Sequence, residues 1–284
     1  MKDEQHVISK IKDTLIKAST TFSDDKKKVL SKLIKQNKSH ENGWIIKSIL
    51  ANALVAEKNK IPLCDDTGIP HVILELGKNS NLTYDLIKAI QQGVKQGLKE
   101  LPGRPMAVKG DDTQRLEQSQ GLYKSSGAIA IAPIQVIKMK GPGIKVHILM
   151  QGGGPEIRAK TSKIFHEHKI SVIIEEIVNW ATEGARLLGC TPCTPTIGLG
   201  RTHYEATSLM LEAMIKGNFT VQNNLEKEIT SKLNKTNIGP LGLSGWPTAL
   251  ATFLQIGPQR ASGIRVASLR LCCLAEPRKA CCTL

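Results

Sequence analysis

Residues 62–76 read PLCDDTGIPHVILEL, a cysteine-containing loop followed directly by a run of apolar and β-branched residues. The prolines and Gly68 favour a loop, whereas residues 71–76 (HVILEL) have the composition of a strand, which we expect to stop at Gly77. This stretch therefore predicts a loop that presents Cys64 and two carboxylates beside the start of a strand. Loops of this kind carry function when a scaffold positions them.

The rest of the chain alternates between helical and strand-like patterns. Residues 5–59 have helical periodicity, with apolar side chains at Ile8, Ile11 and Leu15. Further helices are expected at 84–100, 171–188, 202–216 and 225–233, and strands at 128–139, 144–150, 249–256 and 264–271. The turn KGPG at 140–143 joins two of these strands. The fold class is therefore mixed α/β, with motifs on loops next to strands.

The length of 284 residues and a hydrophobic content of 40% suffice for a buried core. We expect one domain over residues 1–284, with a helical N-terminal part at 1–60 and an α/β part at 61–284. No apolar run reaches about 18 residues, and the first 15 residues are charged and helix-patterned, so we expect neither a membrane span nor a signal peptide. The predicted location is the cytoplasm.

The formal net charge of +14 does not by itself indicate nucleic-acid binding. Most of the excess is Lys spread over helical faces, as in residues 24–38, and aromatic side chains are not interleaved with it. A basic field of this kind favours a small anionic substrate. We expect no nucleic-acid partner.

Seven cysteines at positions 64, 190, 193, 272, 273, 281 and 282 are the most informative residues. An odd number in a chain of this length argues against a disulfide framework. The pair Cys190 and Cys193 forms a CxxC, which alone is a weak indication of zinc or redox chemistry, and no second CxxC or histidine follows at zinc-finger spacing. Metal ligation, catalysis and plain burial all remain open from these residues alone.

The residues beside the cysteines resemble a known family. PLCDDTG, the QGGG at 151–154, GCTPCTP followed by Gly200-Arg201-Thr202, and CLAEPR at 273–278 occur in this order. Together they resemble the α subunit of class I fumarate hydratases and L(+)-tartrate dehydratases, in which the first motif reads CQDTG. Cys190 lies twelve residues before Thr202, as the second cluster cysteine does before the Thr of that family's GGT motif. The resemblance covers roughly residues 40 to 280.

This resemblance implies an oxygen-sensitive hydro-lyase with a [4Fe–4S] cluster in a site that loops form and the α/β lobes enclose. Cys64, Cys190 and Cys273 would be its ligands. Cys193 remains an alternative to Cys190, and Cys272 remains an alternative to Cys273. Three thiolates leave one iron open to act as a Lewis acid on a hydroxyl group. Asp66 would be the catalytic acid, unless it only caps a turn with the residues that follow.

By the same resemblance, the substrate carboxylates would be bound by residues in four stretches of the chain. They are Asp65, Thr67, Gly152, Gly153, Gly154, Arg201, Thr202, Gln259 and Arg260. The sequence departs from the family where Asp65 replaces Gln, Arg201 replaces Gly, and Gln259 or Arg260 takes the place of a His. The substrate of such a hydro-lyase therefore need not be fumarate, and tartrate or another hydroxy acid is equally consistent.

The general base of the family lies on another subunit or C-terminal domain. We therefore expect a β subunit that supplies this base and further substrate-binding residues. Two other classes stay open: a cluster-binding redox or oxygen sensor without turnover, and a zinc or nucleic-acid-binding module.

Overall fold

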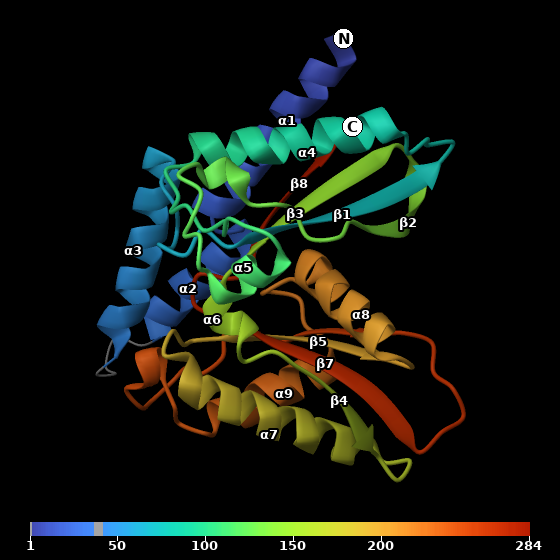
Figure 1. Ribbon diagram of the computed structural model, residues 1–284. Coiled ribbons are helices and arrows are strands. Elements are labelled where there is room, and N and C mark those ends of the chain that lie inside the picture. The colour runs from blue at the N-terminus through green and yellow to red at the C-terminus, as the bar shows by residue number, and fades with distance from the viewer. Residues whose placement is uncertain (1, 37–41) are drawn as a thin grey trace. The chain divides into compact units, whose positions relative to one another are not determined.

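A computed structural model describes residues 2–36 and 42–284, which have the expected mixed α/β fold with a helical N-terminal part (Figure 1). The helices are α1 (Lys2–Thr20), α2 (Asp24–Gln36), α3 (Gly43–Asn59), α4 (Tyr84–Glu100), α5 (Asp112–Glu117), α6 (Gly153–Glu156), α7 (Ile170–Leu188), α8 (His203–Lys216) and α9 (Asn224–Asn234), with 3-10 turns η1 (Ser126–Ala128) and η2 (Pro240–Gly242). The strands are β1 (Ile69–Lys78), β2 (Gln135–Pro142), β3 (Ile144–Gln151), β4 (Lys160–Phe165), β5 (Thr194–Gly200), β6 (Phe253–Ile256), β7 (Ile264–Cys272) and β8 (Arg278–Thr283).

The described residues form two compact units, each with its own sheet. Unit 1 contains the chain up to residue 22, residues 53–152 and residues 278–284, and unit 2 contains the described residues of 23–52 and 153–277. Helix α3 contributes residues to both units. The expectation of one domain over the whole chain stays a prediction.

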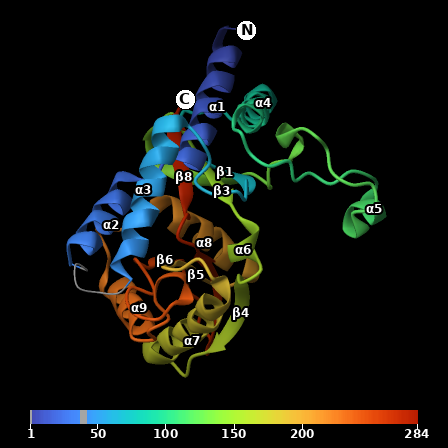
Figure 2. The ribbon, with the colours of Figure 1, turned by 90° about the vertical axis from the view of Figure 1, so that its left-hand side faces the viewer.

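Unit 1 is built on the sheet β2-β1-β3-β8. Its central strand β1 pairs in parallel with β2 and antiparallel with β3, and β3 pairs antiparallel with β8. Helices α1 and α4 pack together on one face of this sheet (Figures 1 and 2). Their core includes Ile11, Leu15 and Val94 against Leu74 and Ile148, all less than 2% exposed. Burying this apolar surface is the main favourable term that holds the unit together.

Unit 2 is built on the sheet β4-β7-β5-β6, with α8 on one face and α7 and α9 on the other (Figures 1 and 2). Helix α8 packs closely on β5 because Gly198 has no side chain: a Cβ there would lie 2.0 Å from the Ala206 carbonyl oxygen. On the other face, Ile173, Ile177 and Ile229 belong to the apolar core. This three-layer arrangement buries β5 along its whole length.

Most of the expected elements are present, with some differences at their ends. The helical region 5–59 is interrupted at residues 21–23, and residues 37–41 lie outside the described part of the chain. The expected strands at 128–139 and 249–256 begin only at Gln135 and Phe253, and β1 continues through Gly77 to Lys78. The strands joined by KGPG do not pair with each other, because β1 lies between them and pairs with both.

In residues 2–36 and 42–284, no helix is long and apolar enough to span a membrane.

Candidate functional site

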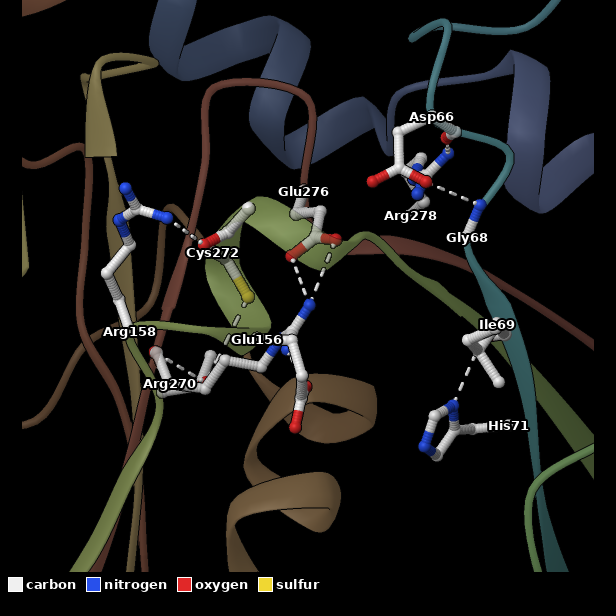
Figure 3. Close-up of polar contacts among 12 residues, drawn as sticks. Asp66, Gly68, Ile69, His71, Glu156, Arg158, Arg270, Cys272, Glu276 and Arg278 are labelled. Carbon is white, nitrogen blue, oxygen red and sulfur yellow. Dashed lines mark hydrogen bonds and ion pairs between the residues drawn. The ribbon is translucent and has the colours of Figure 1, made fainter. Parts of the chain in front are cut away.

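The Cys64 loop lies in unit 1 between α3 and β1. Cys64 is partly buried, and burial raises the pKa of its thiol, while the backbone N–H of Asp66 and the charge of Arg278 oppose that rise. Asp66 Oδ1 accepts a hydrogen bond from the Gly68 N–H at 3.0 Å (Figure 3). The turn needs a glycine because Gly68 has φ of +82°, which other residues rarely adopt. Asp66 therefore has the turn-capping role in this loop, and its catalytic role stays a proposal.

Two arginines contact this loop. Arg278 is 2% exposed, and its Nη1 donates to the carbonyl oxygens of Asp66 at 2.7 Å and Thr67 at 3.2 Å. Arg104 is more exposed: its Nη1 lies 3.7 Å from Asp65 Oδ2, and its carbonyl accepts from Thr67 Oγ1 at 2.9 Å. Arg278 thus holds the loop backbone, and Arg104 places a second guanidinium where an anion can reach it.

The pairing of β1 with β3 brings the glycine-rich turn beside the Cys64 loop. Ile69 pairs with Gln151, so the residues before Ile69 and after Gln151 leave the sheet at the same edge. A Cβ on Gly68 would lie 3.0 Å from the Gln151 carbonyl oxygen, so the two loops approach closely. Gly152 is buried at this edge, and α6 begins at Gly153. Unit 1 therefore brings together Asp65, Asp66, Thr67 and Gly152, whose role as a substrate site stays a prediction.

In unit 2 the Cys190 and Cys273 loops are hydrogen-bonded to each other. Leu274 donates its N–H to the Cys190 carbonyl at 2.8 Å. Cys190 is exposed and follows Gly189, whose left-handed conformation ends α7. Cys273 is partly buried; burial and the charge of Glu276 raise the pKa of its thiol to about 12, while two backbone N–H groups of the following turn oppose the rise. Two of the three expected ligands therefore lie on adjacent loops.

The two rival cysteines lie in the core of the same unit. Cys193 is 0% exposed and belongs to the apolar cluster around α7, and burial raises the pKa of its thiol to about 12. Cys272 is also 0% exposed, at the end of β7, and burial followed by the charge of Glu276 raises its pKa. Because both side chains are 0% exposed, burial favours Cys190 and Cys273 as ligands.

Two buried cations contact the turn that follows Cys273. Lys26 Nζ donates to the carbonyl oxygens of Leu274 at 2.8 Å and Glu276 at 2.7 Å, and burial lowers the pKa of Lys26 to about 8. Arg270 is 0% exposed; its Nη2 lies 3.2 Å from each carboxylate oxygen of Glu276, and its Nη1 pairs with Glu156 of α6 (Figure 3). These contacts fix the backbone of the Cys273 loop.

The later motifs lie at the other end of the second sheet. Strands β5 and β7 pair antiparallel, with Thr194 opposite Cys272 and Gly200 opposite Val266. The cysteine loops flank the first end of β5, and Arg201 follows its second end. Six residue steps at about 3.3 Å make the two ends about 20 Å apart.

The side chains at this second end have partners of their own. Arg201 pairs with Glu205 of α8, with Nη2 2.7 Å from Oε1, and Thr202 caps α8 by accepting the Glu205 N–H at 3.1 Å. Gln259 Nε2 donates to the carbonyl of Gly257 at 2.9 Å, and Arg260 is exposed on the same loop. Unit 2 therefore does not bring Arg201, Thr202, Gln259 and Arg260 to Cys190 and Cys273, because a full strand length separates them.

The donor set fits an iron–sulfur cluster. All seven cysteines lie in the described part of the chain and are free thiols, and Cys64, Cys190 and Cys273 are the expected ligands that are not fully buried. Backbone N–H groups favour the thiolate of Cys64 and of Cys273, as hydrogen bonds to sulfur do at cluster sites. Within either unit, the described residues form no group of three or more His, Cys, Asp and Glu side chains that could hold a metal ion.

Comparison with known proteins shows that this chain belongs to the hydro-lyase class of enzymes. The same comparison identifies its family. The chain belongs to the fumarate hydratase (Fumerase) family, whose model matches residues 8–282. The resemblance inferred from the cysteine and glycine motifs is thereby confirmed.

Several known proteins are similar in sequence to this chain over most of its length. It is 31% identical over 274 residues to a Methanocaldococcus jannaschii protein with the provisional name L(+)-tartrate dehydratase subunit alpha, covering 92% of this chain and 91% of that protein. It is 23% identical over 258 residues to L(+)-tartrate dehydratase subunit alpha of Escherichia coli K12, covering 88% and 82%. The protein of that name from Shigella sonnei matches equally. These relatives are named as subunits, which implies a partner chain for them.

Sequence reasoning missed the charged residues that support the loops. Lys26, Arg104 and Arg270 have no motif of their own in the sequence. The signal for Arg270 was available, since it is a charged residue inside the otherwise apolar run of residues 266–273, and such a residue is buried only with partners. Lys26 could not be found this way, because it lies in a Lys-rich helix among exposed lysines.

Proposed function

We propose that this chain is the cluster-carrying α subunit of an oxygen-sensitive [4Fe–4S] hydro-lyase that hydrates or dehydrates a small hydroxy acid of the malate or tartrate type. Family membership supports the hydro-lyase class, and the names of the relatives support the role of an α subunit. The observation that carries the proposal is the joined pair of cysteine loops in unit 2, in which Cys190 and Cys273 are accessible and their neighbours are buried.

The proposed ligands are Cys64, Cys190 and Cys273. In unit 1 Arg278 holds the backbone of the Cys64 loop. In unit 2 the Cys190 and Cys273 loops are hydrogen-bonded to each other. Three thiolates leave one iron of the cluster without a protein ligand, and when bound the cluster supplies a Lewis acid for the substrate hydroxyl at that iron.

Asp66 is the proposed acid. Hydroxide is a poor leaving group, and a carboxyl that protonates the departing oxygen lowers the barrier. Asp66 lies two residues from Cys64, and Arg278 and the Gly68 N–H hold the loop around it. In this proposal Asp66 combines the turn contact at Oδ1 with the role of the acid.

The proposed substrate contacts come from the same loops. Gly153 and Gly154, exposed after the buried Gly152, have backbone N–H groups that no Cβ shields from an anion. Asp65 and Thr67 complete the sequence-predicted contacts, and the guanidinium of Arg104 beside Asp65 adds a cation for a carboxylate. Arg201, Thr202, Gln259 and Arg260 stay sequence predictions; they lie a strand length from Cys190 and Cys273, which is longer than a four-carbon diacid.

A β subunit is the proposed source of the general base. Removing the proton beside a carboxylate needs a base, and we place it on the partner because the relatives are named as subunits. Alone, this chain should bind the cluster and catalyse poorly.

The test is a steady-state assay of the anaerobically reconstituted pair of subunits. Fumarate, malate, both tartrate enantiomers and methylated diacids are offered in hydration and dehydration. We expect turnover of at least one hydroxy diacid, with fumarate not clearly the best substrate because of Asp65. A stable cluster without turnover of any of them would contradict the enzyme and indicate a sensor.

A further inference from the structure

We propose that Arg270 is a positioning residue that joins the glycine-rich turn to the Cys273 loop, with Lys26 securing the same loop from α2. This inference rests on the proposed function, since it takes Cys273 as a cluster ligand and the glycine-rich turn as part of the substrate site.

The first step of the argument is the burial of Arg270. Arg270 is 0% exposed, and a buried guanidinium needs partners that offset its charge, because an isolated buried charge is strongly disfavoured. Here one nitrogen reaches the Glu276 carboxylate at 3.2 Å and another pairs with Glu156 (Figure 3). Arg270 therefore bridges the buried carboxylate of Glu276 and the exposed carboxylate of Glu156.

The second step is where those carboxylates lie. Glu156 is the last residue of α6, which begins at Gly153 in the glycine-rich turn. Glu276 lies three residues after Cys273 and donates its backbone N–H to the Cys273 carbonyl at 2.9 Å. One side chain thus connects the proposed substrate contacts of unit 2 with a proposed cluster ligand.

The third step is the second cation. Lys26 Nζ binds the carbonyls of Leu274 and Glu276, and the N–H of Leu274 binds the Cys190 carbonyl. Lys26 therefore fixes the backbone that joins the two cysteine loops through these two carbonyl oxygens, whereas Glu156 is bound by the side chain of Arg270. The arrangement thus has two arms: the contact of Arg270 with Glu156, and the contacts of Arg270 and Lys26 with the Cys273 loop. Mutation can separate them.

The experiment uses the full α chain with its partner subunit, reconstituted anaerobically with iron and sulfide. The variants are Glu156→Gln, Glu276→Gln, Lys26→Met and Arg270→Met. Exposed residues supply matched controls of the same chemistry, Lys28→Met on α2 and Arg186→Met on α7. The readouts are the rate of iron loss to excess EDTA, the electron paramagnetic resonance spectrum of the reduced cluster without substrate, KM and kcat for tartrate and malate, and the thermal midpoint.

We expect the two arms to have different effects. Glu276→Gln and Lys26→Met should accelerate iron loss about ten- to a hundredfold and change the spectrum, as loss of a residue supporting a metal ligand does. Glu156→Gln should keep the control rate of iron loss and the wild-type spectrum, while KM rises about tenfold. Arg270→Met should show both effects, and Arg270→Lys should restore part of each because it keeps the charge without the two-pronged geometry.

Equal behaviour of Glu156→Gln and Glu276→Gln, or a lowered thermal midpoint with unchanged iron loss and KM, would overturn the proposal. If Arg270→Met does not fold, the comparison of Glu156→Gln with Glu276→Gln still tests the proposal. A wild-type complex that takes up no iron contradicts the proposed function itself. Iron uptake by the wild type without separation of the two arms contradicts only the role of Arg270.

Discussion

At the scale of the residue, burial distinguishes cysteines that the sequence leaves equivalent. Cys190 and Cys193 are three positions apart, yet one is exposed after a helix end and the other is 0% exposed in the core. Cys272 is the last residue of β7 and is 0% exposed, whereas Cys273 is the first residue of the loop that follows and is partly buried. Sequence motifs therefore predict which loops carry the ligands, and burial in the folded chain is what favours one cysteine within each pair.

The assignment of Cys190 rather than Cys193 as a ligand predicts that replacing each cysteine with alanine has a different effect on iron content and stability. Cys190→Ala removes an exposed thiol, so we expect loss of bound iron with unchanged stability. Cys193→Ala leaves a small cavity, so the free energy of unfolding should fall by about 1–2 kcal/mol with iron retained. Iron analysis and denaturant unfolding of both variants check this. Iron loss in Cys193→Ala alone would contradict the assignment.

Asp66 has a structural and a proposed catalytic role that one substitution separates. Asn keeps an oxygen that can accept from the Gly68 N–H, so Asp66→Asn should preserve the loop and the cluster. It cannot donate a carboxyl proton, so kcat should fall about 10²- to 10⁴-fold. Asp13→Asn, an exposed change on α1, is the control. Wild-type turnover of Asp66→Asn would leave Asp66 only as the turn cap.

At the scale of the element, periodic helices were predictable and irregular strands were not. The amphipathic pattern of residues 84–100 gave α4 with its observed ends, which Thr83 caps by accepting the Leu86 N–H at 3.2 Å. Strands β4 (KTSKIF) and β8 (RKACCT) were missed, because they carry charged residues and are short. Their pairing depends on β7 and β3, which are distant in sequence.

The packing of α8 on β5 depends on a single glycine. In Gly198→Ala the new Cβ would lie 2.0 Å from the Ala206 carbonyl oxygen and 2.4 Å from the Met210 nitrogen, both backbone atoms. The helix would have to move, so we expect a loss of more than about 2 kcal/mol in unfolding free energy. Gly263→Ala is the control, since a Cβ there has no atom within 4 Å. Equal denaturation midpoints for the two variants would contradict this account of the packing.

At the scale of the whole molecule, the order of motifs along the chain predicted the family and the loops that carry the thiols. It did not predict that the residues after β5 lie a strand length from Cys190 and Cys273, because antiparallel pairing with β7 carries the chain to the opposite end. It also did not predict the buried charge of Lys26, whose partners Leu274 and Glu276 are far away in sequence, or the pairing of Arg270 with the distant Glu156. Motif spacing contains no information about the direction of strands.

The central claim is that this chain carries an oxygen-sensitive iron–sulfur cluster on three cysteines. The most direct measurement is the iron and sulfide content and visible absorption of the chain purified with its partner subunit under strict anaerobiosis. We predict about four irons and four sulfides per α chain, lost on exposure to air together with dehydratase activity. Bound zinc in place of iron, or dehydratase activity that persists after complete removal of iron, would contradict the account.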